Sequence, residues 1–205
     1  MADVPAALAT SESLMERKSR QVRERIVQAA EELFRANGYD GVSVTDIAAR
    51  ADVGRTTFFR YFGDKAEVVF AKEQAMFDAL RVLAEGAATE TATTLLQAIE
   101  QLRPIILKIC EQASSDADGY ALHLGLLEQH IELRARDALK TQQAGAELAD
   151  VLVARGATKA TAVLAAHVAL ACYQTARGLT NDPRTLPAEV ARAFDSVATL
   201  HEPLR

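Results

Sequence analysis

Two short helix-forming segments joined by a tight turn constrain the fold of this chain more than any other feature. Residues 43–46, Ser-Val-Thr-Asp, have the pattern of a capping box, in which Ser43 covers exposed amides and Asp46 reaches back to the helix start. This helix is short, because residues 52–54, Asp-Val-Gly, form a tight turn, and a second short helix follows from Arg55 to Phe62. Two short helices around a turn that contains glycine predict a helix-turn-helix.

The second short helix has two chemically different faces. Phe58 and Phe62 are four residues apart and face inward together with Ile47. Guanidinium groups pair with guanine, hydroxyls bind phosphate or base edges, and aromatic carbon packs on the thymine methyl, so the outward face suits the major groove of DNA. A small solvated hairpin is the alternative, and it leaves two exposed aromatic side chains beside two arginines unexplained. The outward residues are Arg55, Thr56, Thr57, Phe59, Arg60 and Tyr61.

Helical periodicity continues along the rest of the chain, and no segment requires a β-strand. Alanine, leucine and charged residues dominate, and apolar residues recur every three or four positions, as in amphipathic helices. Pro104 is expected to kink the helix that contains it. We therefore expect an all-α protein. The helices expected besides the two short ones span residues 17–37, 65–83, 95–110, 120–141, 142–154, 158–179 and 188–200.

The chain is expected to divide into four segments. Residues 1–16 are small, polar and aperiodic, which predicts a flexible N-terminal arm. A three-helix helix-turn-helix domain follows at residues 17–65, and a connecting helix at 65–84 leads into a second helical domain at 85–205.

Charge is distributed unevenly between these segments, although the formal net charge is only −5. Residues 17–65 hold ten Lys or Arg against seven acidic residues, a balance of +3, whereas residues 66–205 hold thirteen against eighteen, a balance of −5. The helix-turn-helix segment is therefore the part of the chain suited to face phosphate.

Several classes of protein are excluded by what the sequence lacks. The longest apolar run, residues 163–173, is far shorter than the ~20 residues of a membrane span, and no secretory signal is visible. Cys110 and Cys172 fit no disulfide or zinc pattern. No phosphate loop, nucleophile elbow or metal motif indicates an enzyme. We expect a cytoplasmic, non-enzymatic protein without a cofactor, metal or membrane partner.

A family resemblance rests on two stretches of the N-terminal quarter. Residues 38–48, Gly-Tyr-Asp-Gly-Val-Ser-Val-Thr-Asp-Ile-Ala, and residues 53–68, Val-Gly-Arg-Thr-Thr-Phe-Phe-Arg-Tyr-Phe-Gly-Asp-Lys-Ala-Glu-Val, resemble the DNA-binding domain of the TetR family of transcriptional regulators. The resemblance implies a homodimeric repressor of a palindromic double-stranded DNA operator, released when a small-molecule effector binds a C-terminal ligand-binding and dimerisation domain.

The resemblance also assigns DNA contacts. Thr45 matches a base- or phosphate-contacting position, and Phe59 stands where many members carry Tyr. Lys65 matches a phosphate contact at a helix N-terminus. The basic cluster of residues 17–25 is expected to supply further phosphate contacts. The expected DNA-binding residues are Thr45, Arg55, Thr56, Thr57, Phe59, Arg60, Tyr61 and Lys65.

The resemblance implies a pocket and a dimer interface in the C-terminal half. The segment 158–179 is apolar nearly all round, so we expect it to be buried on several sides, and it and the last helix are the expected dimer interface. Histidine and glutamine side chains that converge on apolar ones are typical of a ligand site, although plain packing is the alternative. The expected lining residues are Ile99, Leu102, Ile106, Cys110, Leu126, Gln129, His130, Leu133, His167 and Gln174.

Two other readings remain open. A helical ligand-binding or protein-interaction module without sequence-specific DNA binding would make Arg60 and Tyr61 dispensable. An oxidation sensor would use Cys110 or Cys172, although a buried thiol is usually plain core.

Overall fold

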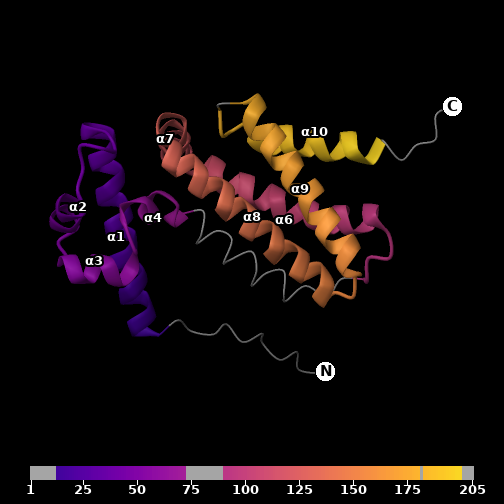
Figure 1. Cartoon of the computed structure of the whole chain (residues 1–205), viewed down its shortest axis with the longest axis horizontal. Coiled ribbons are helices and arrows are strands. Elements are labelled where there is room, and N and C mark those ends of the chain that lie inside the picture. The colour runs from indigo at the N-terminus through magenta and orange to yellow at the C-terminus, as the bar shows by residue number, and fades with distance from the viewer. Residues whose placement is uncertain (1–12, 73–89, 181, 200–205) are drawn as a thin grey trace, which may run out of the picture. The chain divides into compact units, whose positions relative to one another are not determined.

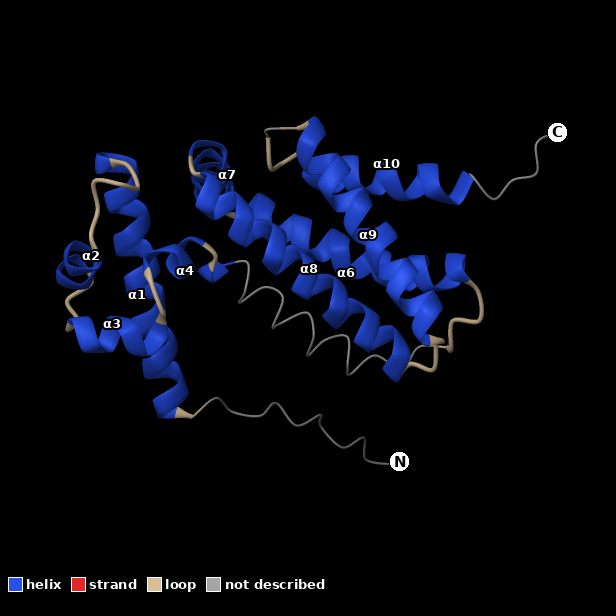
Figure 2. Cartoon of the chain, in the orientation of Figure 1, coloured by secondary structure: helices blue, strands red, loops and turns tan. Residues whose placement is uncertain are grey.

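The computed structural model describes residues 13–72, 90–180 and 182–199, and all regular elements in these ranges are helices (Figure 2). This confirms the all-α fold. The chain divides into two compact units, residues 1–69 and 70–205, and each is described by itself. Residues 1–12 of the expected arm and most of the expected connecting helix, residues 73–84, lie outside the described residues.

The described part of the first unit, residues 13–69, contains four helices: α1 (Leu14–Asn37), α2 (Val44–Arg50), α3 (Arg55–Tyr61) and α4 (Lys65–Val69) (Figure 1). α1 begins at Leu14 because Ser13 and Glu16 form a capping box, so residues 14–16 belong to this helix and not to the arm in which they were expected. Its C-terminal end is Gly38, whose φ of 70° is the left-handed conformation that favours glycine.

The helix-turn-helix forms as the sequence predicts. Ser43 and Asp46 make the expected capping box at the start of α2. Asp52 adopts a φ of 53° in the turn before α3, a conformation that Asp tolerates better than most residues. Ile47 and Phe58 are completely buried, and Phe62 is buried beside them. These side chains hold two helices of seven residues each, which are too short to be stable in isolation.

The second unit contains α6 (Leu95–Ser115), α7 (Ala117–Gln129), α8 (Ile131–Ala154), α9 (Lys159–Leu179) and α10 (Leu186–Thr199). α6 runs through Pro104 without interruption. α9 packs against α6, α8 and α10, with an inner face rich in alanine that lets these helices approach closely. The described residues contain no helix that is long and apolar enough to cross a membrane.

One expected helix boundary in this unit was wrong. The helix break falls at His130 and not near residue 141, since His130 adopts an extended conformation between α7 and α8. No proline or glycine stands next to this break, so the sequence carries no local signal for it. α9 is buried on several sides, as expected, because it packs against α6, α8 and α10, and its outer face leaves Val163, Leu164 and His167 exposed.

Leu102 on α6 offers a test of this core, since it is completely buried among residues of α8, α9 and α10. Leu102→Ala is expected to lower the free energy of unfolding by about 2–5 kcal/mol, because it loses buried apolar area and leaves a cavity. Urea denaturation measures the change. Leu139→Ala on α8 is the matched control, because Leu139 is exposed. Equal losses for the two variants would contradict the described packing.

Candidate nucleic-acid interface

α3 presents a chemically mixed outer face. Phe58 is completely buried, whereas the neighbouring Phe59 is 47% exposed, so consecutive aromatic residues point in opposite directions. Two expected contact residues, Thr57 and Tyr61, are half-buried. The exposed members of the expected set on α3 are Arg55, Thr56, Phe59 and Arg60. Guanidinium, hydroxyl and aromatic groups therefore stand together on one helix.

Tyr61 is fixed at the end of α3 from two directions. A hydrogen bond to the Ser19 side chain on α1 lowers the pKa of the Tyr61 hydroxyl below its usual value. The guanidinium carbon of Arg60 lies 5.2 Å from the centre of the Tyr61 ring, within cation–π range. The Tyr61 side chain is thus held between α1 and the guanidinium of Arg60.

The start of α2 presents Thr45, which is exposed in the first turn. This turn is held rigidly, because the Ser43 amide donates to Asp46 Oδ2 at 2.8 Å and the Asp46 amide donates to Ser43 Oγ at 3.2 Å. Hydrogen bonds from Ser43 also lower the pKa of the Asp46 carboxyl. The carboxylate is therefore available to the cap throughout the neutral pH range.

Lys65 was expected to contact a phosphate, but in the structure its ammonium contacts other groups of the protein. Its ammonium donates to the carbonyl oxygens of Tyr39 at 2.7 Å and Val42 at 3.0 Å. It also lies 3.9 Å from the centre of the Tyr39 ring. Three groups of the protein therefore contact this charge.

Two contacts that stabilise the helix-turn-helix were not predicted from the sequence. Arg50 on α2 pairs with Glu32 on α1, with its Nε donating to Glu32 Oε2 at 2.9 Å. The guanidinium carbon of Arg23 on α1 lies 5.2 Å from the centre of the Phe62 ring. Both pairs join residues far apart in sequence, so no short-range spacing signals them.

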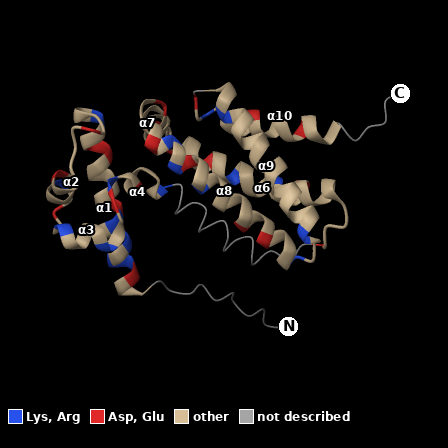
Figure 3. Cartoon of the chain, viewed as in Figure 1, with Lys and Arg blue, Asp and Glu red and all other residues tan. Residues whose placement is uncertain are grey.

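The N-terminal half of α1 adds positive charge to the first unit, as Figure 3 shows. Glu24 forms an exposed ion pair with Arg20 across one helical turn at 3.4 Å, and such a pair is worth little in water. The exposed basic residues of this cluster are Arg17, Lys18, Arg20 and Arg25.

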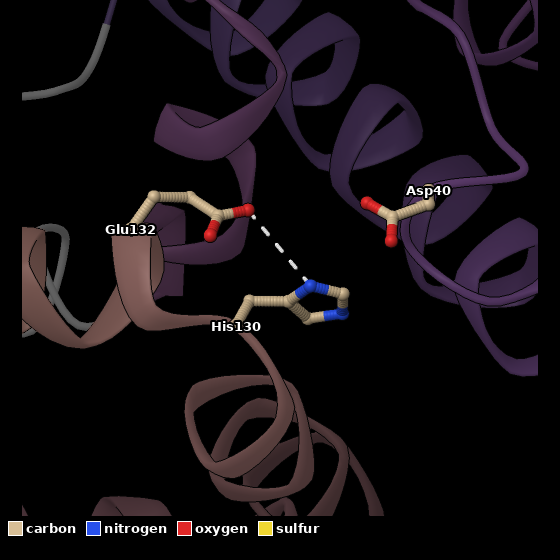
Figure 4. Close-up of side chains that lie close together, drawn as sticks. All are labelled: Asp40, His130 and Glu132. Atoms are coloured by element: carbon tan, nitrogen blue, oxygen red, sulfur yellow. Dashed lines mark ion pairs between the residues drawn. The ribbon is translucent and has the colours of Figure 1, made fainter.

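The expected pocket residues do not form one group. Leu126 and Leu133 are buried outside the main core. His130 is half-buried, and its Nδ1 lies 3.8 Å from the Glu132 carboxylate (Figure 4, which also draws Asp40 of the other unit). Those that lie in the core with residues of α8, α9 and α10 are Ile99, Leu102, Ile106 and Cys110. Those that are exposed are Gln129, His167 and Gln174.

An aromatic cluster that sequence reasoning did not identify lies elsewhere in the second unit. The ring of buried His123 meets Phe70 edge-on at 5.4 Å and stacks on Tyr120 at 6.4 Å between centres. The Lys140 ammonium lies 5.5 Å from the centre of the Phe70 ring. The cluster joins the beginning of this unit to α7 and α8.

Comparison with known proteins identifies the class to which this architecture belongs. The HTH-type transcriptional regulator TcmR of Streptomyces glaucescens is 31% identical over 163 residues, which are 75% of this chain and 69% of TcmR. The described helix-turn-helix is therefore that of a DNA-binding transcriptional regulator. The family model described as bacterial regulatory proteins, tetR family, matches residues 26–71. The chain belongs to the TetR family.

Solved structures share the fold over most of the chain. A transcriptional regulator from Aquifex aeolicus VF5 has a TM-score of 0.55 at 19% identity and covers 87% of this chain and 99% of its own. FadR of Thermus thermophilus, a TetR-family transcriptional repressor solved in complex with lauroyl-CoA, has a TM-score of 0.52 at 21% identity. It covers 89% of this chain and 96% of its own.

The two cysteines allow a test of the oxidation-sensor reading. Burial raises the pKa of the Cys110 thiol to about 12 and raises that of Cys172 as well. Because the thiolate is the reactive form, both thiols are expected to react with a disulfide reagent at pH 8 more slowly in the folded protein than in denaturant, with the larger decrease at Cys110. Absorbance of the released thiolate measures the rates. A thiol that reacts quickly in the folded chain would revive the sensor reading.

Proposed function

We propose that this protein is a homodimeric repressor that binds a palindromic operator and releases it when a small, largely apolar effector binds the C-terminal helical domain. The outer face of α3 carries this proposal, because its two arginines, its threonines and Phe59 are the groups that read base edges. The protein acts in the cytoplasm, and its function is binding and not catalysis.

An apolar effector is supported by the composition of the second unit. Its core on α6, α8, α9 and α10 is built mostly from aliphatic side chains and alanine, with Tyr173, Phe194 and the two cysteines. FadR, which shares this fold, binds lauroyl-CoA, a molecule with a long apolar chain. An effector that prefers one of two conformations of this unit would change DNA affinity by its difference in affinity for the two.

A homodimer through α9 and α10 is supported by the outer face of α9. Val163 is 38% exposed and Leu164 is 51% exposed, although both are aliphatic. The only charged residues of this 21-residue helix are Lys159 and Arg177. A depletion of charge with exposed aliphatic groups is typical of an interface core. Dimerisation also supplies the two recognition helices that a palindrome requires, about 34 Å apart.

Selection of bound sites from a random duplex pool near physiological salt tests the DNA-binding part. The full chain is expected to enrich a palindrome whose half-sites lie about ten base pairs apart, because a two-fold dimer presents two copies of α3. Weak binding that salt abolishes, from a folded dimer, would contradict the proposal and favour the helical module without sequence-specific binding.

Arg55 tests the chemistry of the readout in the same selection. Arg55→Ala is expected to relax a guanine preference at one position of each half-site, at a cost of about 1–3 kcal/mol in binding. Arg103→Ala on α6 is a control for the loss of one charge, since Arg103 pairs with Asp195 within the second unit. An unchanged consensus for Arg55→Ala would remove this residue from the base contacts.

Leu164→Glu tests the dimer interface. In the proposed dimer Leu164 is an aliphatic contact at the interface, and this variant replaces it with a charge. The dimer dissociation constant is expected to rise by about 30-fold or more, because a central interface residue contributes about 2 kcal/mol or more. Sedimentation velocity over a range of protein concentrations measures the shift. Leu139→Glu on α8 is the control, since it places the same charge on an exposed leucine outside the proposed interface. Dissociation by Leu139→Glu alone would move the interface to α8.

A further inference from the structure

The Lys65 ammonium is held by the turn between α1 and α2. Two of its protons point at the carbonyl oxygens of Tyr39 and Val42, at 2.7 Å and 3.0 Å. The Tyr39 ring covers the charge at 3.9 Å from its centre. An ammonium has three donors, so the protein uses most of its hydrogen-bonding capacity.

The turn that Lys65 holds is tightly constrained. Gly38 has a φ of 70°, and a Cβ on Gly41 would lie 2.6 Å from the carbonyl oxygen of Asn37. The Val42 amide donates to the Tyr39 carbonyl at 3.3 Å, so this carbonyl accepts from both Val42 and Lys65. The turn leads directly into Ser43, the N-cap of α2. Its conformation therefore sets where α2 begins.

Lys65 also stands at the start of α4, which packs against α1. The Asp64 carboxylate accepts from the Glu67 amide at 2.8 Å, so the local cap of α4 is supplied by Asp64 and does not need Lys65. The Tyr39 ring lies 5.3 Å from Phe34, which is buried in α1. The ammonium thus ties the first residue of α4 to a turn that is itself anchored in the core.

We propose that Lys65 is a positioning residue, which locks the turn between α1 and α2 onto the start of α4 and thereby holds α2 and α3 in the arrangement that binds DNA. α3 depends on this lock because it packs on α2. The effect of Lys65 on DNA affinity then arises from the position of the two helices. A direct phosphate contact, as the resemblance implies, would instead require the ammonium to exchange a carbonyl for a phosphate oxygen.

Salt dependence separates the two roles. Binding of the full-length Lys65→Ala variant to the duplex that the wild-type chain selects is measured from about 50 to 300 mM salt. A positioning role predicts an affinity loss of about ten-fold or more with an unchanged slope of log affinity against log salt. A phosphate contact predicts a slope smaller by about 0.9. The selected duplex serves whether or not it is palindromic, so failure of the operator proposal does not affect this test.

Two further variants sharpen the comparison. Lys65→Arg would preserve a phosphate contact, because a guanidinium binds phosphate well, but its planar fork does not reproduce the contacts to two carbonyls and a ring. The positioning role therefore predicts that Lys65→Arg does not restore affinity. Lys108→Ala on α6 is the matched control for the loss of one lysine, and it is expected to bind as the wild type does.

Gly41→Ala reaches the same turn without touching Lys65. Since the added Cβ displaces Asn37 or the turn itself, this variant is expected to lose affinity with an unchanged salt slope. The double variant Gly41→Ala/Lys65→Ala is expected to lose little more than either single variant, because both changes release one turn. Additive losses, a smaller slope or rescue by arginine would overturn the proposal.

A measurement without DNA covers the case of an unstable variant. Carbonyl carbon shifts of Tyr39 and Val42 in selectively labelled full-length protein report whether the lysine donates to them. Both resonances are expected to move upfield in Lys65→Ala and to stay in place when the wild-type chain binds the duplex. An upfield shift on addition of duplex to the wild type would show that the ammonium leaves the turn for phosphate, and would overturn the proposal.

Discussion

The burial of Phe58 is the constraint on which the DNA-binding part of this protein depends. A helix of seven residues gains too few hydrogen bonds to offset the cost of nucleation, so α3 exists because tertiary packing supports it. Phe58 supplies that support with its ring completely buried, at 5.8 Å from Phe62. Once Phe58 faces inward, the helical period turns Arg55, Phe59 and the neighbouring polar residues outward. The exposed polar face of α3 is thus a consequence of the burial of Phe58.

The second unit is organised around the packing of α9. α9 lies against three other helices, and alanines on its inner face allow their backbones to approach closely. The alanines allow close packing but fill little volume, and most of the larger aliphatic side chains of the core come from the surrounding helices. The outer face of the same helix keeps valine and leucine exposed. One helix therefore combines a central place in the core with an exposed aliphatic surface.

The sequence predicted those parts of the structure that depend on neighbouring residues. Ser43 and Asp46 predict the start of α2, and the spacing of Phe58 and Phe62 predicts which face of α3 is buried. Both signals lie within about one helical turn, so the sequence alone shows them. The break at His130 was not predictable, because no proline or glycine marks it. The pairing of Arg50 with Glu32 was missed for a related reason, as it depends on how α1 and α2 cross. The expected pocket residues share helix faces, which a sequence shows. Whether such a face is buried depends on which helices pack together, and Gln129, His167 and Gln174 are exposed.

The dependence of α3 on a single aromatic anchor has a consequence for how the first unit opens. α3 has no side-chain cap at Gly54, and one turn of it cannot persist after Phe58 leaves the core. The amides that donate within the helix begin at Phe58, and they lose their acceptors together when loss of the anchor removes the helix. Their hydrogen exchange should therefore follow the opening of α1, α2 and α3 as one cooperative unit, whereas the uncapped amides of the first turn exchange freely. The outer face of α3, which we propose as the DNA-reading surface, is thereby present in full or absent altogether.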